Sequence, residues 1–157
     1  MQTIWITGGS SGIGFATAKE FINNNWQVVI SSSNKIKLES AKKKLELNNN
    51  KNLVHAIVCD ISSKNNVDET INSIEKNIGK IDIALLNASA YSPNKNQIFD
   101  ISNYELLVDV NIKGTLYCVN KLKDVMKNRN NTIAIISSPL GYRAVSYTHL
   151  TLPTTRL

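Results

Sequence analysis

The chain has 157 residues, of which 42% are hydrophobic and 19% charged, which is typical of one globular domain and leaves no apolar run near the roughly 20 residues that span a membrane. The net charge of +6 comes from scattered lysines without interleaved aromatic side chains, so we expect neither nucleic acid nor a membrane as partner. Two distant cysteines, Cys59 and Cys118, lack metal-ligand spacing, which predicts reduced thiols, a cytoplasmic protein and no metal site.

Strand and helix patterns alternate along the chain. The first predicted strand begins almost at Met1, so we expect no signal peptide. Apolar and β-branched runs predict five strands, at Thr3–Thr7, Gln27–Ser31, Leu53–Cys59, Ile81–Leu86 and Thr132–Ile136. Helical spacing predicts four intervening helices, at Ile13–Asn24, around Leu38–Leu45, at Val67–Ile78 and at Tyr104–Lys127.

This alternation predicts an α/β fold. Right-handed βαβ crossovers place the five strands in one parallel sheet, and we expect a doubly wound Rossmann order of 3-2-1-4-5. The switch point then lies between the first and fourth strands. Ligands of such sheets bind outside the carboxyl ends of the strands, where every candidate residue below is expected.

A glycine-rich turn follows the first strand, in the segment Thr7-Gly8-Gly9-Ser10-Ser11-Gly12-Ile13-Gly14. Gly8 allows the tight turn, Gly12 lets the backbone approach a pyrophosphate, and Gly14 lets the helix pack close to the sheet. The turn places backbone N–H groups and a helix dipole beneath a phosphate, which favours nucleotide binding over a plain turn. Its spacing is GxxxGxG rather than the common GxGxxG.

Polar residues also follow the other strands. Asp60 and Ile61 close the third strand, and Asn87, Ala88 and Ser89 close the fourth. Each has a structural alternative, because a helix cap suits Asp60 and a turn suits Asn87.

Two more polar residues come later in the chain. Asn111 lies inside the last predicted helix, where an inward-facing asparagine needs partners and a satisfied core amide is the alternative reading. Ser137 and Ser138 close the fifth strand.

Together these motifs resemble the short-chain dehydrogenase/reductase family, from Thr3 to about Gly141. The matching segments are TGGSSGIG, CDI, LNAS, VNIKG and IISS, in this order. The resemblance implies a Rossmann sheet, without the family's later strands, that binds NAD or NADP and acts on a small-molecule carbonyl or alcohol substrate. It also implies a homo-oligomeric parent protein.

The resemblance implies roles for individual residues as well. The glycine turn (Thr7, Gly8, Ser10, Ser11, Gly12, Ile13 and Gly14) holds the pyrophosphate. Asp60 and Ile61 contact adenine, and Asn87, Ala88 and Ser89 lie against the cofactor. The two catalytic candidates are Asn111, which braces a proton-relay water, and Ser138, which hydrogen-bonds the substrate oxygen.

The end of the second strand bears on cofactor choice. Members that prefer NAD have an acidic residue there, whereas this chain has Ser33, Asn34 and Lys35. No carboxylate repels a 2′-phosphate, and hydroxyls with a nearby lysine favour NADP over NAD.

The family's acid/base pair is absent from its expected positions. The resemblance places a tyrosine near Thr151 and a lysine near Thr155, and no lysine follows Lys127. We therefore assign neither Tyr142 nor Tyr147 as the catalytic acid. Without a lysine beside it, a tyrosine keeps a pKa near 10 and is a poor proton donor at neutral pH.

The composition changes near the end of the chain. Residues 145–157 contain no acidic residue and no lysine, and they resemble a translated sequencing adapter joined to a truncated reading frame. We expect residues 1–144 to be an incomplete NAD(P)-binding domain and the remainder to be non-native. A non-catalytic nucleotide-binding protein and a non-functional fragment are the alternatives to an oxidoreductase.

Overall fold

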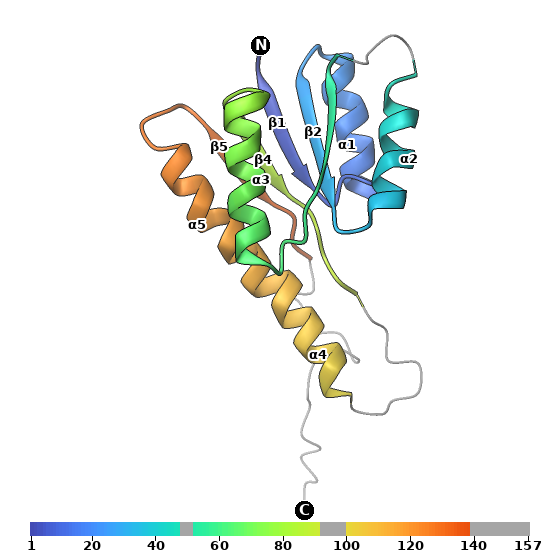
Figure 1. Ribbon diagram of the computed structural model, residues 1–157, viewed down its shortest axis with the longest axis vertical. Helices are drawn as coiled ribbons and strands as arrows, with labels where there is room; N and C mark the ends of the chain where they lie inside the picture. Colours follow the sequence, from blue (N-terminus) through green and yellow to red (C-terminus); the bar gives the residue numbers. More distant parts are fainter. Residues whose placement is uncertain (48–51, 92–99, 139–157) are drawn as a thin grey trace, which may run out of the picture.

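The computed structural model describes residues 1–47, 52–91 and 100–138. They form a five-stranded parallel sheet with helices on both faces (Figure 1). The strands are β1 (Thr3–Thr7), β2 (Gln27–Ser32), β3 (Val54–Val58), β4 (Ile81–Leu86) and β5 (Thr132–Ile135). Their order, β3-β2-β1-β4-β5, confirms the doubly wound arrangement predicted from the alternating pattern.

The helices form two layers around the sheet. They are α1 (Gly12–Asn23), α2 (Lys35–Leu45), α3 (Lys64–Asn77), α4 (Ile101–Leu107), the π-helical η1 (Val108–Gly114) and α5 (Thr115–Val125). Helices α1 and α2 cover one face, and α3 and α5 cover the other (Figure 1). Each layer buries its own apolar cluster against the sheet, as expected for strands with few polar positions.

The predicted helix Tyr104–Lys127 is wrong in two respects. It begins earlier, at Ile101, because the Asp100 carboxylate accepts the backbone N–H of Ser102 at 3.0 Å and so caps the helix there. Its middle, η1, is a π-helix rather than an α-helix. The hydroxyl of Thr115, the first residue of α5, donates to the carbonyl of Asn111 in η1 at 3.0 Å. Such π segments often occur at functional sites.

One buried polar contact fastens the centre of the sheet. Trp5, on β1, is fully buried, and its indole N–H donates to the Ser31 hydroxyl of β2 at 3.1 Å. This bond satisfies a donor that would otherwise be costly to bury, so the large ring can fill the core beneath α3 and α5.

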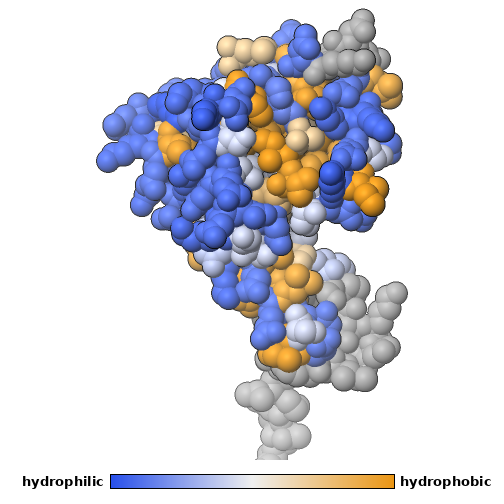
Figure 2. Space-filling model, viewed as in Figure 1, coloured by the Kyte–Doolittle hydropathy of each residue, from blue (hydrophilic) through white to orange (hydrophobic). Residues whose placement is uncertain are grey.

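Apolar side chains are exposed at both ends of the sheet and on α4. On the face shown in Figure 2 apolar surface gathers over the strand layer between α3 and α2, and again on α4. Val58, on the edge strand β3, is exposed. At the other sheet edge Ile135 and Ile136 are exposed, as expected for an uncovered fifth strand. Among the described helices none has the length and apolar character needed to cross a bilayer.

A row of hydrogen-bonded polar side chains crosses the amino-terminal end of the sheet. The Thr3 hydroxyl donates to Gln27 Oε1 at 3.3 Å, and Gln27 Nε2 lies 3.1 Å from His55 Nε2. An amide nitrogen can only donate, so the ring nitrogen accepts and carries no proton. Burial, with a further contribution from the positive charge of Lys42, lowers the pKa of His55 and reinforces the neutral ring.

This neutral histidine predicts a pH-dependent stability. Below about pH 6.5 the unfolded chain protonates His55 while the folded chain resists it, so stability falls as the pH drops through that value. The variant His55→Gln keeps an acceptor that does not titrate. The urea midpoint of unfolding, measured at pH 7.5 and at pH 5.5, should therefore decrease more between the two pH values for the wild type than for His55→Gln. An equal fall in both proteins would contradict the assignment.

Candidate functional site

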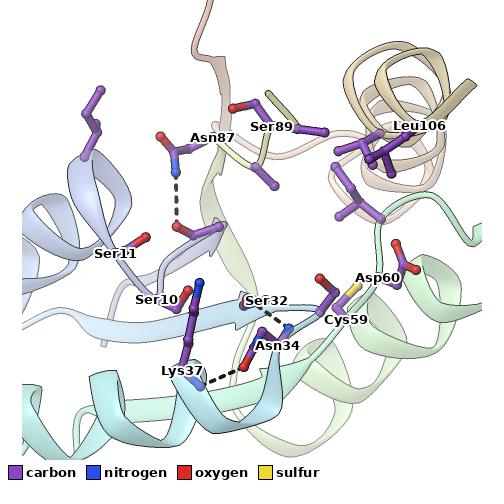
Figure 3. Close-up of a pocket in the computed structure, with 17 residues that line it drawn as sticks. Ser10, Ser11, Ser32, Asn34, Lys37, Cys59, Asp60, Asn87, Ser89 and Leu106 are labelled. Carbon is purple, nitrogen blue, oxygen red and sulfur yellow. Dashed lines mark hydrogen bonds between the residues drawn. The ribbon is translucent and has the colours of Figure 1, made fainter. Parts of the chain in front are cut away.

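A cleft of about 470 Å³ lies at the carboxyl ends of the strands, at the predicted switch point (Figure 3). It is bounded by the β1–α1 turn, the ends of β2, β3 and β4, and the α4–η1 helix. The residues predicted from sequence that line it are Gly8, Ser10, Ser11, Ile13, Ser33, Asn34, Asp60, Ile61, Asn87, Ala88 and Ser89.

Thr7 does not line the cleft but holds its two sides together from behind. Its buried hydroxyl oxygen accepts the backbone N–H groups of Asn87 and Ala88, each at 3.0 Å, and its own proton points to the Leu85 carbonyl at 3.5 Å. Asn87 bonds back to the β1 side, because its Nδ2 donates to the carbonyl of Thr7 at 3.2 Å and to that of Gly8 at 3.2 Å. One dashed line marks a bond of Asn87 in Figure 3. We call this set of bonds the Thr7–Asn87 junction.

Gly12 and Gly14 also lie outside the cleft lining, and each has a distinct role in the turn. A Cβ on Gly14 would lie 2.6 Å from the Gly8 carbonyl oxygen and 2.7 Å from Asn87 Nδ2, so only glycine fits against the junction. Gly12 has a φ of +55°, and a Cβ there would meet no atom within 4 Å. The backbone at Gly12 is therefore open to close approach by a ligand.

The N-terminus of α1 differs from those of the other capped helices. Asn34, Ser63 and Asp100 each accept a backbone N–H and cap α2, α3 and α4. Ser11 makes no such bond at the start of α1, whose first turn, like those of α2, α3 and α4, holds no acidic residue. The first N–H groups of α1 thus remain available to an anion next to the open face of Gly12.

At the end of β2 the lysine that faces the cleft is Lys37. The expected Lys35 does not line the cleft, and it pairs instead with Glu39 at 3.9 Å. Lys37 lies in the first turn of α2, where Asn34 Oδ1 accepts its backbone N–H at 2.9 Å, and its side chain extends toward Ser10 (Figure 3). The capping asparagine indicates that Lys37 lies in the first turn of the helix, but the direction of its side chain depends on how α2 lies on the sheet.

Asp60 and Cys59 lie at the end of β3. Asp60 does not cap α3, because Ser63 does; Asp60 Oδ1 instead accepts the N–H and the hydroxyl of Ser62, at 3.0 and 2.7 Å. Cys59 lines the cleft although sequence reasoning did not place it there. Burial raises its pKa, so the thiol stays neutral near pH 7 and is a poor nucleophile.

A second cleft, of about 450 Å³, adjoins the first along Ile13, Asn87, Ala88 and Ser89. Both catalytic candidates, Asn111 and Ser138, line it. No titratable side chain is found among the described residues of its lining. The described part of this cleft therefore offers hydrogen bonds but no acid or base.

Asn111 is not a core amide, so that alternative reading is wrong. Its side chain is exposed and spans to the segment after β4, where Oδ1 accepts the Ala90 N–H at 2.8 Å and Nδ2 donates to the Ala90 carbonyl at 2.9 Å. This two-point contact fixes the backbone that separates the two clefts. Leu106 of α4 and Val110 of η1 complete the apolar wall, and neither was predicted.

Several predicted features lie outside the described residues. They are Tyr142, Tyr147, the positions Thr151 and Thr155, and the segment 145–157. Within the described ranges, no three His, Cys, Asp or Glu side chains are grouped closely enough to hold a metal ion.

Comparison with known proteins decides the family. A model of the family described as short chain dehydrogenase matches residues 2–150. The chain belongs to the short-chain dehydrogenase family. It is 30% identical over 126 residues to an uncharacterised oxidoreductase of Staphylococcus saprophyticus, which covers 80% of this chain and 53% of that protein. It is also 30% identical over 138 residues to an uncharacterised oxidoreductase of Staphylococcus aureus, covering 87% and 58%.

Solved structures of short-chain dehydrogenases share the fold. A short chain dehydrogenase from Bacillus anthracis, 25% identical, superposes with a TM-score of 0.81 over 92% of this chain and 58% of that one. A short-chain type dehydrogenase/reductase from Mycobacterium marinum, 21% identical, gives 0.83 over 92% and 59%. The chain thus spans little more than half the length of these relatives.

Proposed function

We propose that the parent protein of this short-chain dehydrogenase transfers a hydride between NADP or NAD and a small carbonyl or alcohol substrate. The carrying observation is the cleft at the switch point, with the open N-terminus of α1 on one side and the Thr7–Asn87 junction behind it. The cofactor, when bound, supplies or accepts the hydride.

The residues of the larger cleft suit a dinucleotide. The N–H groups of Ser11, Gly12 and Ile13 hold the pyrophosphate, where the absence of a Cβ on Gly12 permits close approach. Asp60 and Ile61 contact adenine at the end of β3, and Asn87 to Ser89 lie against the nicotinamide half.

Cofactor choice depends on the end of β2. Lys37, Ser33 and Asn34 line the cleft there, and among the described lining residues Asp60 carries the only carboxylate. A 2′-phosphate can accept hydrogen bonds from the hydroxyls and from the Lys37 ammonium, without an acidic neighbour on β2 to repel it. We therefore propose NADP rather than NAD.

The described lining of the smaller cleft suits the substrate but holds no titratable side chain that could act as a proton donor. Ser138 holds the substrate oxygen, and Asn111 positions the backbone at Ala90 beside it. The acid/base pair expected near Thr151 and Thr155 is absent from the sequence. Cys59, in the lining of the larger cleft, has a raised pKa and donates a proton poorly. We propose that this chain binds the cofactor without turning over.

We extend the proposal to the chain as a whole. Residues 1–144 are the nucleotide-binding domain, and residues 145–157 are a non-native tail. Both cysteines, Cys59 and Cys118, are free thiols, which fits a cytoplasmic protein. Burial raises the pKa of Cys118 to about 12, so this thiol is unreactive. The exposed apolar side chains of α4 fit a homo-oligomeric parent. The missing proton donor favours a second candidate, a non-catalytic nucleotide-binding protein.

Affinity measurements test the assignment of Lys37. NADPH should bind more tightly than NADH, and Lys37→Gln should weaken NADPH about tenfold, because a charge-assisted bond to a phosphate contributes about 1.5–3 kcal/mol. NADH affinity should not change. Lys43→Gln is the matched control, because Lys43 lies on the same helix outside the cleft lining. Equal losses of NADPH affinity in both variants would refute a specific role for Lys37.

Turnover is tested separately on the full 157-residue chain. With NADPH bound, a panel of aldehydes and ketones should give no oxidation of the cofactor, measured as constant absorbance at 340 nm. Steady turnover with any carbonyl would show that the chain has a proton donor the proposal lacks. Failure of both cofactors to bind would refute the nucleotide site itself.

A further inference from the structure

A groove runs along the outer surface between α1 and α2, which lie side by side on one face of the sheet (Figure 1). It consists of two cavities of about 490 and 370 Å³ that share Phe15 and Lys44. The larger cavity also shares Ser10, Ser11 and Lys37 with the nucleotide cleft. The groove therefore begins at the glycine turn and leads away from it, toward the end of α2.

The floor of this α1–α2 groove is apolar. Phe15, which is half-buried, and Ile22 line it from α1, and Leu45 lines it from α2, with Ile22 and Leu45 only 3% and 4% exposed at its base. Ile36 and Leu47 stand at its two ends with 81% and 66% of their surface exposed. Exposed apolar side chains that line a concave surface are typical of a binding site rather than of scattered surface residues.

The walls of the groove are cationic. Lys19, Lys37 and Lys44 line the two cavities, and no acidic side chain does so among the described residues. Of the other lysines of α2, Lys35 pairs with Glu39 and Lys42 with Glu46, whereas Lys43 is exposed outside the groove. The lysines that line the groove belong to none of the ion pairs found in the described part of the chain.

We infer that the α1–α2 groove binds an anionic amphiphile, a single acyl chain that carries a phosphate or carboxylate. An apolar floor between cationic walls is complementary to such a molecule, because lysine stems pack on the chain while their ammonium groups stay in water. The anionic head lies at Ser10, Ser11 and Lys37, where hydroxyls and an ammonium gather. The chain extends past Phe15 toward Leu47.

This placement couples the groove to the nucleotide cleft. The head group uses Ser10, Ser11 and Lys37, which are the residues that also line the proposed cofactor site. The amphiphile and NADPH therefore compete, and an acyl anion would reduce cofactor occupancy. The competition rests on the proposed function, whereas binding of the amphiphile does not.

Calorimetric titration of the full chain with dodecyl phosphate, below its micelle concentration, tests the groove. Saturable one-to-one binding is expected, and Leu47→Asp and Lys44→Glu should each weaken it about tenfold, equivalent to about 1.4 kcal/mol. Both residues are exposed, so the variants should keep the wild-type circular dichroism spectrum. Lys43→Glu, with the same charge change outside the groove, is the matched control.

Related probes separate the contributions of head and chain. Laurate tests a carboxylate head in place of the phosphate, and binding of either anion supports the groove. Dodecanol and inorganic phosphate should bind at least tenfold more weakly than dodecyl phosphate, as each lacks one half of the complementarity. Failure of both anions to bind, equal binding of dodecanol, or an equal loss in Lys43→Glu would overturn the proposal.

Competition is measured last, by titrating NADPH with and without dodecyl phosphate. A rise in the apparent Kd for NADPH is expected, with no change in the maximal signal. If both ligands bind independently, the head-group placement is wrong. If NADPH does not bind even without dodecyl phosphate, the proposed function is wrong. The titration with dodecyl phosphate still tests the groove in that case.

Discussion

The Thr7–Asn87 junction is the contact on which both clefts depend. Parallel strands β1 and β4 are adjacent in the sheet, but the chain leaves them toward opposite faces, and this divergence opens the crevice. The Thr7 hydroxyl accepts two backbone N–H groups just beyond β4, so it extends the pairing of the strands past their last ladder bond. The buried oxygen and all its partners are satisfied, which makes the junction rigid.

Other parts of the site are built outward from that junction. Gly14 must lack a side chain because its Cβ would meet Gly8 and Asn87, and this close approach brings the start of α1 to the back of the cleft. Past the junction, Asn111 holds Ala90 from η1 and so fixes the wall between the two clefts. The two clefts thus share the short backbone segment Asn87–Ser89, which is held by Thr7 on one side and followed by the Ala90 backbone that Asn111 holds on the other.

Sequence patterns predicted the parts of the fold that depend on local composition. The apolar runs around Trp5 and Val29 are buried on both faces, so their strands could be recognised without knowing what covers them. The glycine turn could also be predicted from the sequence, because backbone geometry requires glycine at its positions. The strand order then followed from the handedness of βαβ units, and it agrees with the sheet in the structure.

The features that could not be predicted from the sequence depend on contacts between distant residues and on which side of a helix faces the cleft. Lys35 and Lys37 are two residues apart, and only the orientation of α2 on the sheet decides that Lys37 faces the cleft. Asn111 bonds to Ala90, which is 21 residues away in the chain, so its exposed position was not predictable from its helical spacing. The π-helical turn around it has no simple composition signal.

The central claim is that the Thr7 hydroxyl assembles the nucleotide cleft. The most direct measurement compares Thr7→Val with Thr3→Val, an equally buried threonine at the other end of β1. Amide hydrogen exchange and NADPH affinity are measured for both variants. The account predicts faster exchange at Asn87 and Ala88 and at least tenfold weaker NADPH binding in Thr7→Val only. Equal NADPH affinity in the two variants, with exchange at Asn87 unchanged, would contradict it.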